Sequence, residues 1–360
     1  MTRSHLVERA PADALVDVVR DVAGIHAQVA SAAELSVAAR VDGVAQADVR
    51  AALWEERTLV KTWTVRGTLH LHPSDELPLW TAARRAVPSP WWEAHGVSRA
   101  QAEAAVDAVA EALDGRELLR AELADEVGRR TGDWAGELLA SGWGHIVGQA
   151  AVEGTVVHGP PRGTKATFVR ADQWLPKLPS APAPADALRE ACRRFLRAYG
   201  PGTPRTFADW FAPHLPPAQA RDVFDSLGTE LVEVDVAGSR AWLLAGDGET
   251  GRSEPDGVRL LPEYDCYVMG FRERTALVPE RAGAVVAAHG KGRFEGPGAV
   301  PWLLVDGVVS GTWRRARRGR RIAIAVQPFG RMPAARRSAL DREAARIGDF
   351  LGADTVLEIG

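Results

Sequence analysis

The residues best suited to chemistry in this sequence are His26 and Gln28, in the segment 24–28 that reads Gly-Ile-His-Ala-Gln. An imidazole can accept a proton near neutral pH, and a primary amide can both donate and accept hydrogen bonds. Two positions apart on an extended backbone, the two side chains would point toward one side. A lone His-x-Gln is also a frequent accident, so the pair gains meaning only from its surroundings.

The pair lies at a break between two helical patterns. Apolar residues recur at helical spacing before it, at Leu15, Val18 and Val22, and again after it, from Leu35 onward. Polar side chains at a break between two helices can serve a site rather than a core. We therefore treat His26 and Gln28 as candidate catalytic residues.

The order of elements around the pair recurs three times, as helical patterns followed by two strand-like segments around a turn. The expected helices are 11–23, 31–40, 46–56, 99–113, 116–130, 134–150, 186–199, 205–212 and 216–227. The expected hairpins pair 59–65 with 67–72, 152–158 with 164–170, and 231–236 with 240–244. Three helices and a β-hairpin are the layout of a winged helix, a DNA-binding variant of the helix-turn-helix. A mixed chain can give this order by chance, but three in succession favour tandem winged helices.

The last third of the chain follows another pattern. Short strands are expected at 259–270, 285–288, 302–305, 308–314 and 321–326, and a helix at 333–351. We expect an α+β fold in which three winged helices precede a β-rich, barrel-like C-terminal part. Proline-rich linkers at 86–92 and 176–184 favour domains at 1–90, 91–178, 186–246 and 257–360.

The most distinctive segment is 62–71, which reads Thr-Trp-Thr-Val-Arg-Gly-Thr-Leu-His-Leu. If it forms the first hairpin, Trp63, Leu69 and Leu71 pack, and Arg66 lies at the tip, where an arginine can reach a phosphate or a minor groove. His70 is a second candidate DNA contact. The alternative for His70 is a half-buried histidine whose hydrogen bonds are satisfied within the fold.

A second candidate DNA-binding segment is rich in arginine. The six arginines fall within eight residues, around a turn at Gly319; they are Arg314, Arg315, Arg317, Arg318, Arg320 and Arg321. Such a hairpin can be merely a solvated, charged surface. However, like charges at this density repel one another, and a DNA backbone would relieve the repulsion.

Two acidic segments have less chemical promise. Glu263 and Asp265 offer two carboxylates near a strand, for which a capping or hydrogen-bonding role is expected rather than catalysis. Asp306 and Gly307 form an Asp-Gly hairpin signal, so Asp306 is expected to shape a turn.

Composition narrows the class of protein. The 360 residues are 46% hydrophobic and 25% charged, as in ordinary globular proteins, with no apolar run of about 18 residues for a membrane span. The N-terminus lacks the apolar core of a secretory signal, so a cytoplasmic protein is expected. Cys192 and Cys266 stand far apart, and no metal or disulfide framework is expected. Motifs of P-loop, dinucleotide-binding, zinc-protease and α/β-hydrolase enzymes are absent, and no cofactor is expected.

Charge is distributed unevenly. The formal net charge is −3, yet residues 301–360 hold 11 arginines against six acids, a local balance of +5. A local positive field can guide a polyanion even when the whole chain is mildly acidic. Because 40 of the 44 basic residues are arginine, a GC-rich genome is an alternative reason for the bias.

Taken in this order, segments 24–28, 63–71, 260–270 and 305–313 resemble the AlkZ-like family of bacterial DNA glycosylases, and the resemblance spans most of the chain. It implies three tandem winged helices that form a concave DNA-binding channel, with a β-rich C-terminal part. The family motif is Gln-x-Gln or Gln-x-Asp, and its two polar residues lie at the catalytic centre. Here Gln28 holds the second position and His26 the first, which makes the chain a histidine variant.

The resemblance implies a monomeric, monofunctional enzyme that acts on double-stranded DNA. Its expected substrates are alkylated purines, most of all bulky N7-guanine adducts of a genotoxic natural product, in DNA repair or antibiotic self-resistance. His26 would orient or deprotonate a water, and Gln28 would accept a hydrogen from it or hold the sugar. The alternatives are a non-catalytic winged-helix regulator and a drug-sequestering protein whose tryptophans form a stacking pocket, although scattered tryptophans favour core packing.

Overall fold

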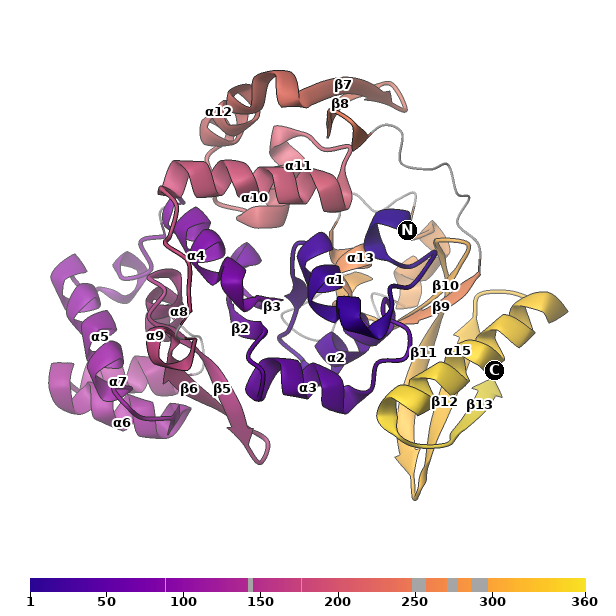
Figure 1. Ribbon diagram of the computed structural model, residues 1–360, viewed down its shortest axis with the longest axis horizontal. Coiled ribbons are helices and arrows are strands. Elements are labelled where there is room, and N and C mark those ends of the chain that lie inside the picture. Colours follow the sequence, from indigo (N-terminus) through magenta and orange to yellow (C-terminus); the bar gives the residue numbers. More distant parts are fainter. Residues whose placement is uncertain (88, 142–144, 176, 248–256, 271–276, 286–296) are drawn as a thin grey trace. The chain divides into compact units, whose positions relative to one another are not determined.

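The computed structural model describes residues 1–87, 89–141, 145–175, 177–247, 257–270, 277–285 and 297–360. They form two compact units (Figure 1). Unit 1 comprises Met1–Arg50, Arg194–Thr206 and Thr229–Gly360, and unit 2 comprises Ala51–Arg193 and Phe207–Gly228. The division into four domains stays a prediction, as does the assignment of winged helices.

Helices followed by a hairpin occur three times along the chain, as the periodicity predicts. The helices of the first two passes are α1 (Leu15–Asp21), α2 (Ala30–Ala38), α3 (Gln46–Trp54), α4 (Leu77–Arg85), α5 (Arg99–Ala112), α6 (Arg120–Thr131), α7 (Asp133–Ala140), α8 (His145–Val152) and α9 (Ala171–Trp174). The helices of the third are α10 (Pro184–Tyr199), α11 (Pro204–Phe211) and α12 (Pro217–Leu227). The hairpins pair β2 (Leu59–Trp63) with β3 (Leu69–Pro73), β5 (Val156–Arg162) with β6 (Lys165–Arg170), and β7 (Leu231–Val236) with β8 (Ser239–Leu244).

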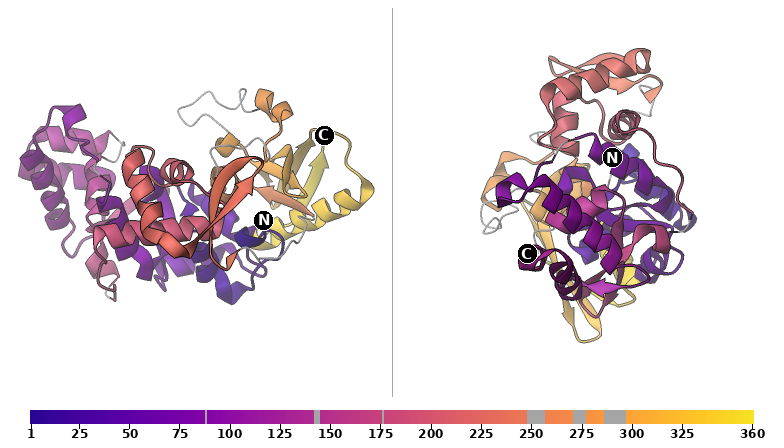
Figure 2. Two further views of the ribbon diagram at one scale, coloured as in Figure 1. Left: turned by 90° about the horizontal axis from the view of Figure 1, so that it is seen from above. Right: turned by 90° about the vertical axis from the view of Figure 1, so that its left-hand side faces the viewer.

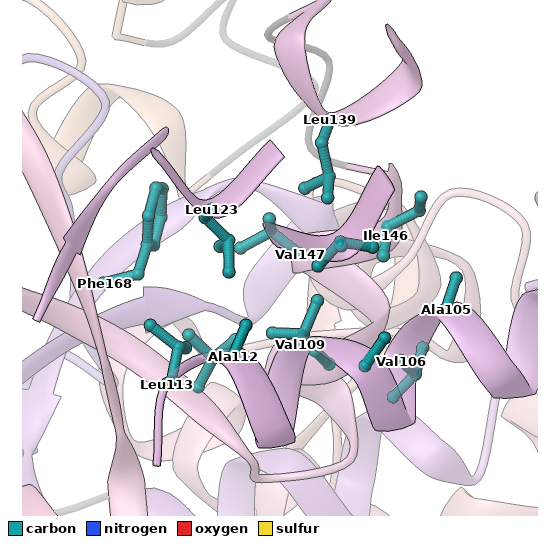
Figure 3. Close-up of a cluster of buried hydrophobic side chains, with 14 of the residues drawn as sticks. Ala105, Val106, Val109, Ala112, Leu113, Leu123, Leu139, Ile146, Val147 and Phe168 are labelled. Carbon is teal, nitrogen blue, oxygen red and sulfur yellow. The ribbon is translucent and has the colours of Figure 1, made fainter. Parts of the chain in front are cut away.

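Unit 2 contains a core built by α5, α6, α7 and α8 (Figure 3). On α5, the fully buried Ala105, Val109 and Ala112 recur at helical spacing and face this core. Phe168 of β6 closes it, and β6 pairs with both β5 and the short β4 (Leu118–Leu119). The helix expected at 99–113 is therefore confirmed, and its buried residues lie on one face.

Unit 1 contains a five-stranded sheet in the order β13-β12-β11-β10-β9. Its strands are β9 (Val258–Leu261), β10 (Trp302–Val305), β11 (Val308–Arg318), β12 (Arg321–Pro328) and β13 (Thr355–Ile359). Neighbours are antiparallel except β12 and β13, which the helix α15 (Ala334–Leu351) connects as a parallel pair. In Figure 1, α15 runs along this sheet, and its Leu340, Ile347 and Phe350 are buried.

A buried carboxylate joins α15 to the edge strand β9. Glu343 accepts from Arg9 at 2.6 Å and from Arg346 at 3.0 Å, and Oε1 also accepts from the backbone N–H of Leu260. Burial alone would raise the pKa of Glu343, but the two arginines hold that pKa below its usual range. Glu343 is therefore ionised at neutral pH and fixes the helix to the sheet.

Several expectations for the C-terminal part are wrong. Among the described residues β9 and β13 are separate edges of an open sheet, so the barrel-like interpretation fails; α15 covers one face, and the sheet need not close on itself. The strand expected at 259–270 ends at Leu261, before Pro262, and α13 (Cys266–Met269) follows. The expected strand 285–288 falls largely outside the described residues. Where one helix is expected at 134–150, the described residues form α7 and α8, and residues 142–144 lie outside the described part.

The turn between β10 and β11 is formed as expected. Asp306 and Gly307 have φ angles of 51° and 81°, as a two-residue hairpin with this twist requires. The Asp306 carboxylate also accepts from the N–H of Gly257 and pairs with Arg336. No helix within the described ranges is long and apolar enough to cross a membrane.

Candidate active site

The turn that ends α1 fixes the position of the candidate catalytic segment. The N–H of Gly24 donates to the carbonyl of Val19, and the N–H of Ala23 donates to that of Arg20. Ala23 and Gly24 have positive φ angles of 55° and 98°. This is a Schellman motif, which satisfies the last carbonyls of the helix and reverses the chain. The next residues form the short strand β1 (Ile25–His26), so the helix end delivers His26 directly into extended backbone.

Tyr199 reinforces this turn. Its hydroxyl donates to the carbonyl of Val22, the last residue before the turn, at 2.8 Å. Tyr199 is itself buried at the end of α10. A buried, hydrogen-bonded tyrosine therefore holds the helix end that precedes His26.

His26 and Gln28 differ in their surroundings. His26 is buried, with 6% of its surface exposed, whereas Gln28 is exposed. The strand ends at His26 and the chain bends at Gln28 before α2 begins at Ala30, so the backbone is not extended over the whole segment. The structure keeps the two residues close in sequence, with the imidazole inside and the amide at the surface. Their catalytic roles stay a prediction.

The His26 ring packs against an aromatic ring from the other end of the chain. The ring centroids of His26 and Tyr264 lie 5.0 Å apart at an interplanar angle of 31°. Tyr264 has a positive φ of 60°, an uncommon conformation for a bulky residue and a sign of local constraint. Burial, and the charge of Glu263, raise the pKa of the Tyr264 hydroxyl, which therefore stays protonated at neutral pH.

A buried ion pair holds Tyr264 in place through its neighbour Asp265. Both nitrogens Nη1 and Nη2 of Arg40 donate to Asp265, each at 2.7 Å, and neither side chain has exposed surface. The hydroxyl of Ser36 donates to the same carboxylate at 2.8 Å. Burial alone would lower the pKa of Arg40, but Asp265 raises it above its usual value. The end of α2 is thus bound to the segment that carries Tyr264.

Asp265 also caps a helix. Its Oδ1 accepts from the N–H of Tyr267, at the start of α13. The expected capping and hydrogen-bonding role of this residue is confirmed. Next to it, burial raises the pKa of the Cys266 thiol to about 12, so this thiol is not ionised at neutral pH.

The first hairpin has the expected form. Arg66 lies at its tip, in a one-turn 3-10 helix (Val65–Gly67), with a φ of 56°. Its Nη1 donates to the carbonyl of Trp210 at 3.2 Å. His70 is buried in β3, and its Nδ1 lies 3.1 Å from the carbonyl of Thr68. This burial favours the interpretation of His70 as a packed histidine; DNA contact by Arg66 and His70 stays a prediction.

The arginine-rich segment forms the tip of the β11–β12 hairpin, which extends below α15 in Figure 1 and is the lowest point of the right-hand view in Figure 2. Five of its six arginines are exposed and Arg315 is half-buried; the exposed ones are Arg314, Arg317, Arg318, Arg320 and Arg321. Within the described ranges only Arg318 has an ion pair, with Glu358 of β13 at 2.9 Å. The hairpin tip therefore carries a concentration of uncompensated positive charge, as the sequence predicts.

Sequence reasoning missed the partners of His26. Tyr264, Arg40 and Ser36 gave no local signal, because Asp265 lies 225 residues from Arg40. The segment that holds Tyr264 and Asp265 could be singled out only as a pair of acids near a strand. In the described part of the chain, no three His, Cys, Asp or Glu side chains are arranged to hold a metal ion.

Comparisons with known proteins all find DNA glycosylases. Residues 19–350 match the family described as "DNA glycosylase AlkZ-like". The chain is 33% identical over 350 residues to a Streptomyces sahachiroi protein named "Interstrand DNA cross-link repair glycosylase", covering 93% of this chain and 90% of that protein. The structure of this chain is similar to that of Streptomyces sahachiroi DNA glycosylase AlkZ, with a TM-score of 0.84 and 31% sequence identity. The match covers 100% of this chain and 97% of the other.

Proposed function

The chain belongs to the AlkZ-like family of DNA glycosylases, and from this premise we propose that it releases alkylated purines, above all bulky N7-guanine adducts of a genotoxic natural product. The observation that carries the proposal is the fixed position of His26, between a helix-ending turn and the ring of Tyr264. The relative named as a cross-link repair glycosylase makes an interstrand cross-link of such a product a second substrate to test.

The chemistry suits a small catalytic set. An N7-alkylated guanine carries a positive charge, so the base leaves without strong help from an acid. Water attacks C1′, the C1′–N9 bond breaks, and its electron pair neutralises the departing purine. The enzyme must mainly place the water and stabilise the developing oxocarbenium ion. The products are the free adducted base and an abasic site, with no cut in the strand.

In this proposal His26, as a neutral imidazole, orients the water and takes its proton. Gln28, at the surface beside it, accepts a hydrogen from the water or holds the sugar. Tyr264 restricts the imidazole from one side, and the Arg40–Asp265 pair keeps Tyr264 there. Tyr264, Arg40 and Asp265 are positioning residues.

The test is base release from a duplex that contains N7-alkylguanine. His26→Ala and Gln28→Ala should each reduce the rate by about 10²–10⁴-fold while DNA binding persists, as loss of a positioned base does. His5→Ala is the control, since His5 pairs with Asp21 at the surface of the same unit. Wild-type rates in both variants would remove His26 and Gln28 from the mechanism without affecting the family assignment.

A further variant separates two roles of the imidazole. His26→Gln gives the side chain that the family motif has at this position, which can orient a water but cannot take its proton. We expect a lower rate, because only the orientation of the water is kept. A variant rate equal to wild type at neutral pH would assign His26 to orientation alone.

We also propose that the three helix-and-hairpin segments are winged helices and that the β11–β12 tip contacts the DNA backbone. The uncompensated charge of the tip supports this role. Arg317→Glu with Arg320→Glu should weaken binding and reduce the slope of log K against log salt by about 2, near 0.9 for each lost phosphate contact. Arg337→Glu with Arg342→Glu, two exposed arginines on α15, is the charge-matched control. An unchanged slope in the double variant would exclude the tip from the interface.

A further inference from the structure

Unit 2 contains a pocket that has no part in the chemistry proposed above. This pocket of about 480 Å³ is lined by the C-terminal end of α4, by α8 and by the segment that carries Trp91 and Trp92. Its volume falls in the range of small-molecule sites. Trp63, at the end of β2, forms part of the wall. Three of the chain's 12 tryptophans therefore meet in one place, although they are scattered in the sequence.

Arg84 is the unusual residue of this pocket. It is 5% exposed, and its Nε and Nη1 are fully buried without a hydrogen-bond acceptor among the described residues. Within the same residues no carboxylate lies at ion-pair distance. Burial lowers the pKa of Arg84 to about 10, so it still carries its charge at neutral pH. A buried charge without a partner is costly and rare in proteins.

Packing accounts for only part of this arrangement. The guanidinium lies 5.7 Å from the ring centre of Phe211, and Arg84 is in the last turn of α4, where the helix dipole favours a cation. These interactions are weaker than an ion pair. The neighbouring His214 adds no negative charge, and Arg84 itself lowers its pKa after burial does. Among the described residues that line the pocket one is an acid, Glu153, and it accepts from Gln149.

The walls offer flat aromatic surfaces. Trp91 and His145 stack at 6.2 Å with an interplanar angle of 20°, and both line the pocket. Burial, and then the neighbouring His95, lower the pKa of His145, which is therefore neutral at pH 7. The indole Nε1 of Trp91 is a buried donor that finds no acceptor among the described residues. Two kinds of donor thus lack acceptors around one cavity.

An adjacent pocket of about 500 Å³ shares Trp91 and Trp92 but differs in charge. Its lining includes Glu103 and Asp107 in addition to Glu153. Its arginine, Arg99, is paired with Glu103 at 2.8 Å. Within the described part of the chain, Arg84 therefore differs from Arg99 in having no carboxylate at ion-pair distance.

We propose that the pocket of Arg84 binds a planar aromatic molecule that carries an anionic group, with the ring against the tryptophans and the anion on the guanidinium. A bidentate anion would satisfy the buried N–H groups, and the indole N–H of Trp91 would gain an acceptor. Two sources share this chemistry, an aromatic carboxylic acid and a nucleoside monophosphate. Unlike the glycosylase proposal, this one concerns unit 2 alone and needs no DNA.

The test uses the whole protein and isothermal titration calorimetry with four probes: 2-naphthoate, neutral 2-naphthamide, guanosine monophosphate and guanosine. The acid should bind at least about tenfold more tightly than its neutral partner, a difference of about 1.4 kcal/mol. Arg84→Met should remove that difference. Tighter binding of guanosine monophosphate than of 2-naphthoate, again dependent on Arg84, would identify the anion as a nucleotide phosphate.

Two further variants keep the test decisive. Arg120→Met is the matched control, because Arg120 also lies over a phenylalanine ring, 5.2 Å from that of Phe168, but outside the pocket. Trp92→Ala should weaken naphthoate and naphthamide equally and leave their ratio unchanged. Equal affinity of the two naphthalene probes for the wild-type protein, or naphthoate binding unchanged by Arg84→Met, would overturn the proposal.

Discussion

Unit 1 and unit 2 each bury an arginine, and the two arginines are in opposite electrostatic situations. Arg40 has no exposed surface and is held by both oxygens of Asp265. Arg84 is almost equally buried, yet it lacks a carboxylate among the described residues. A completed pair fixes local structure, whereas an incomplete one is a cost to stability unless something else completes it. Burial alone therefore does not distinguish a structural arginine from a ligand-binding one; the partner does.

The largest effect should come from making Arg40 resemble Arg84. Asp265→Asn leaves the buried guanidinium facing a neutral amide and should lower the free energy of unfolding of unit 1 by about 3–5 kcal/mol. Base release should fall as well, because Tyr264 loses its support. Urea unfolding and a glycosylase assay measure the two effects. Glu263→Gln, the same charge change two residues away on a half-buried side chain, is the control; equal effects of both would contradict the special role of the pair.

A smaller effect should follow when one donor of that cluster is removed. Ser36→Ala leaves the ion pair intact but takes away the hydroxyl that donates to Asp265 at 2.8 Å. A hydrogen bond to a charged group contributes about 1.5–3 kcal/mol, so we expect a loss of that order in urea unfolding. Ser310→Ala, whose hydroxyl bonds the nearby carbonyl of Val308, should change little. No difference between the two variants would mean that the Ser36 hydroxyl does not help to hold the carboxylate.

In unit 2, removal of the buried arginine should stabilise the protein rather than destabilise it. Arg84→Met removes an unpaired buried charge and should raise the free energy of unfolding by roughly 1–2 kcal/mol in buffer without aromatic acids. Arg120→Met should instead be destabilising, because the Arg120 guanidinium donates to the carbonyl of Leu139 at 3.3 Å. Thermal or urea unfolding of both variants tests this. A destabilised Arg84→Met protein would mean that the contacts with Phe211 and the helix end outweigh the missing partner.

The smallest effect concerns mild acid. Burial, and then Lys61 and Arg120, lower the pKa of His158 well below its usual value, and burial also lowers those of His145 and His214; all three lie in unit 2. Below about pH 6.5 these histidines bind protons in the unfolded chain but not in the folded unit, so the free energy of unfolding falls as the pH drops. For His158 alone the loss between pH 7.5 and 5.5 is about 1 kcal/mol.

Unit 1 should respond only in stronger acid. In the folded protein the pKa of Glu343 is held below its ordinary value. The stability that ionised Glu343 contributes is therefore complete above its ordinary pKa, and it is lost as the pH falls through the lower pKa of the folded state. Hydrogen exchange at pH 7.5 and 5.5, with each rate divided by the intrinsic exchange rate at that pH, should therefore show protection falling in unit 2 first. His158→Gln should reduce that fall, and an equal loss of protection in both units would contradict the assignment.

The local parts of this fold could be read from the sequence. Helical spacing located α5 and α10, and an Asp-Gly pair located the turn at Asp306, because each depends on residues close in the chain. The sequence pattern predicts one helix where α7 and α8 are described, and a strand where the short α13 lies. The pairing of β13 beside β12 was missed too, because a parallel neighbour across a helix leaves no local pattern.

The candidate site likewise has parts that the sequence indicates and parts that only the folded structure shows. His26 and Gln28 stood out because their polarity interrupts a helical pattern, and the arginines of the hairpin because they are adjacent. The ring of Tyr264, the Asp265–Arg40 pair and the meeting of Trp63 with Trp91 depend on tertiary packing. A single sequence holds no signal that pairs such distant positions.

The separation of Arg40 from Asp265 has a consequence for the protein during its synthesis. After Arg40 the ribosome adds 225 residues up to and including Asp265, at about 5–20 residues per second, so Arg40 waits about 10–45 s for its carboxylate. Until then the segment around His26 lacks both Tyr264 and the ion pair that holds it. An unfinished chain can fold its first helices, but we expect no glycosylase activity from it before the C-terminal part emerges. Glycosylase activity therefore requires that the chain be synthesised at least as far as Asp265, which completes the ion pair.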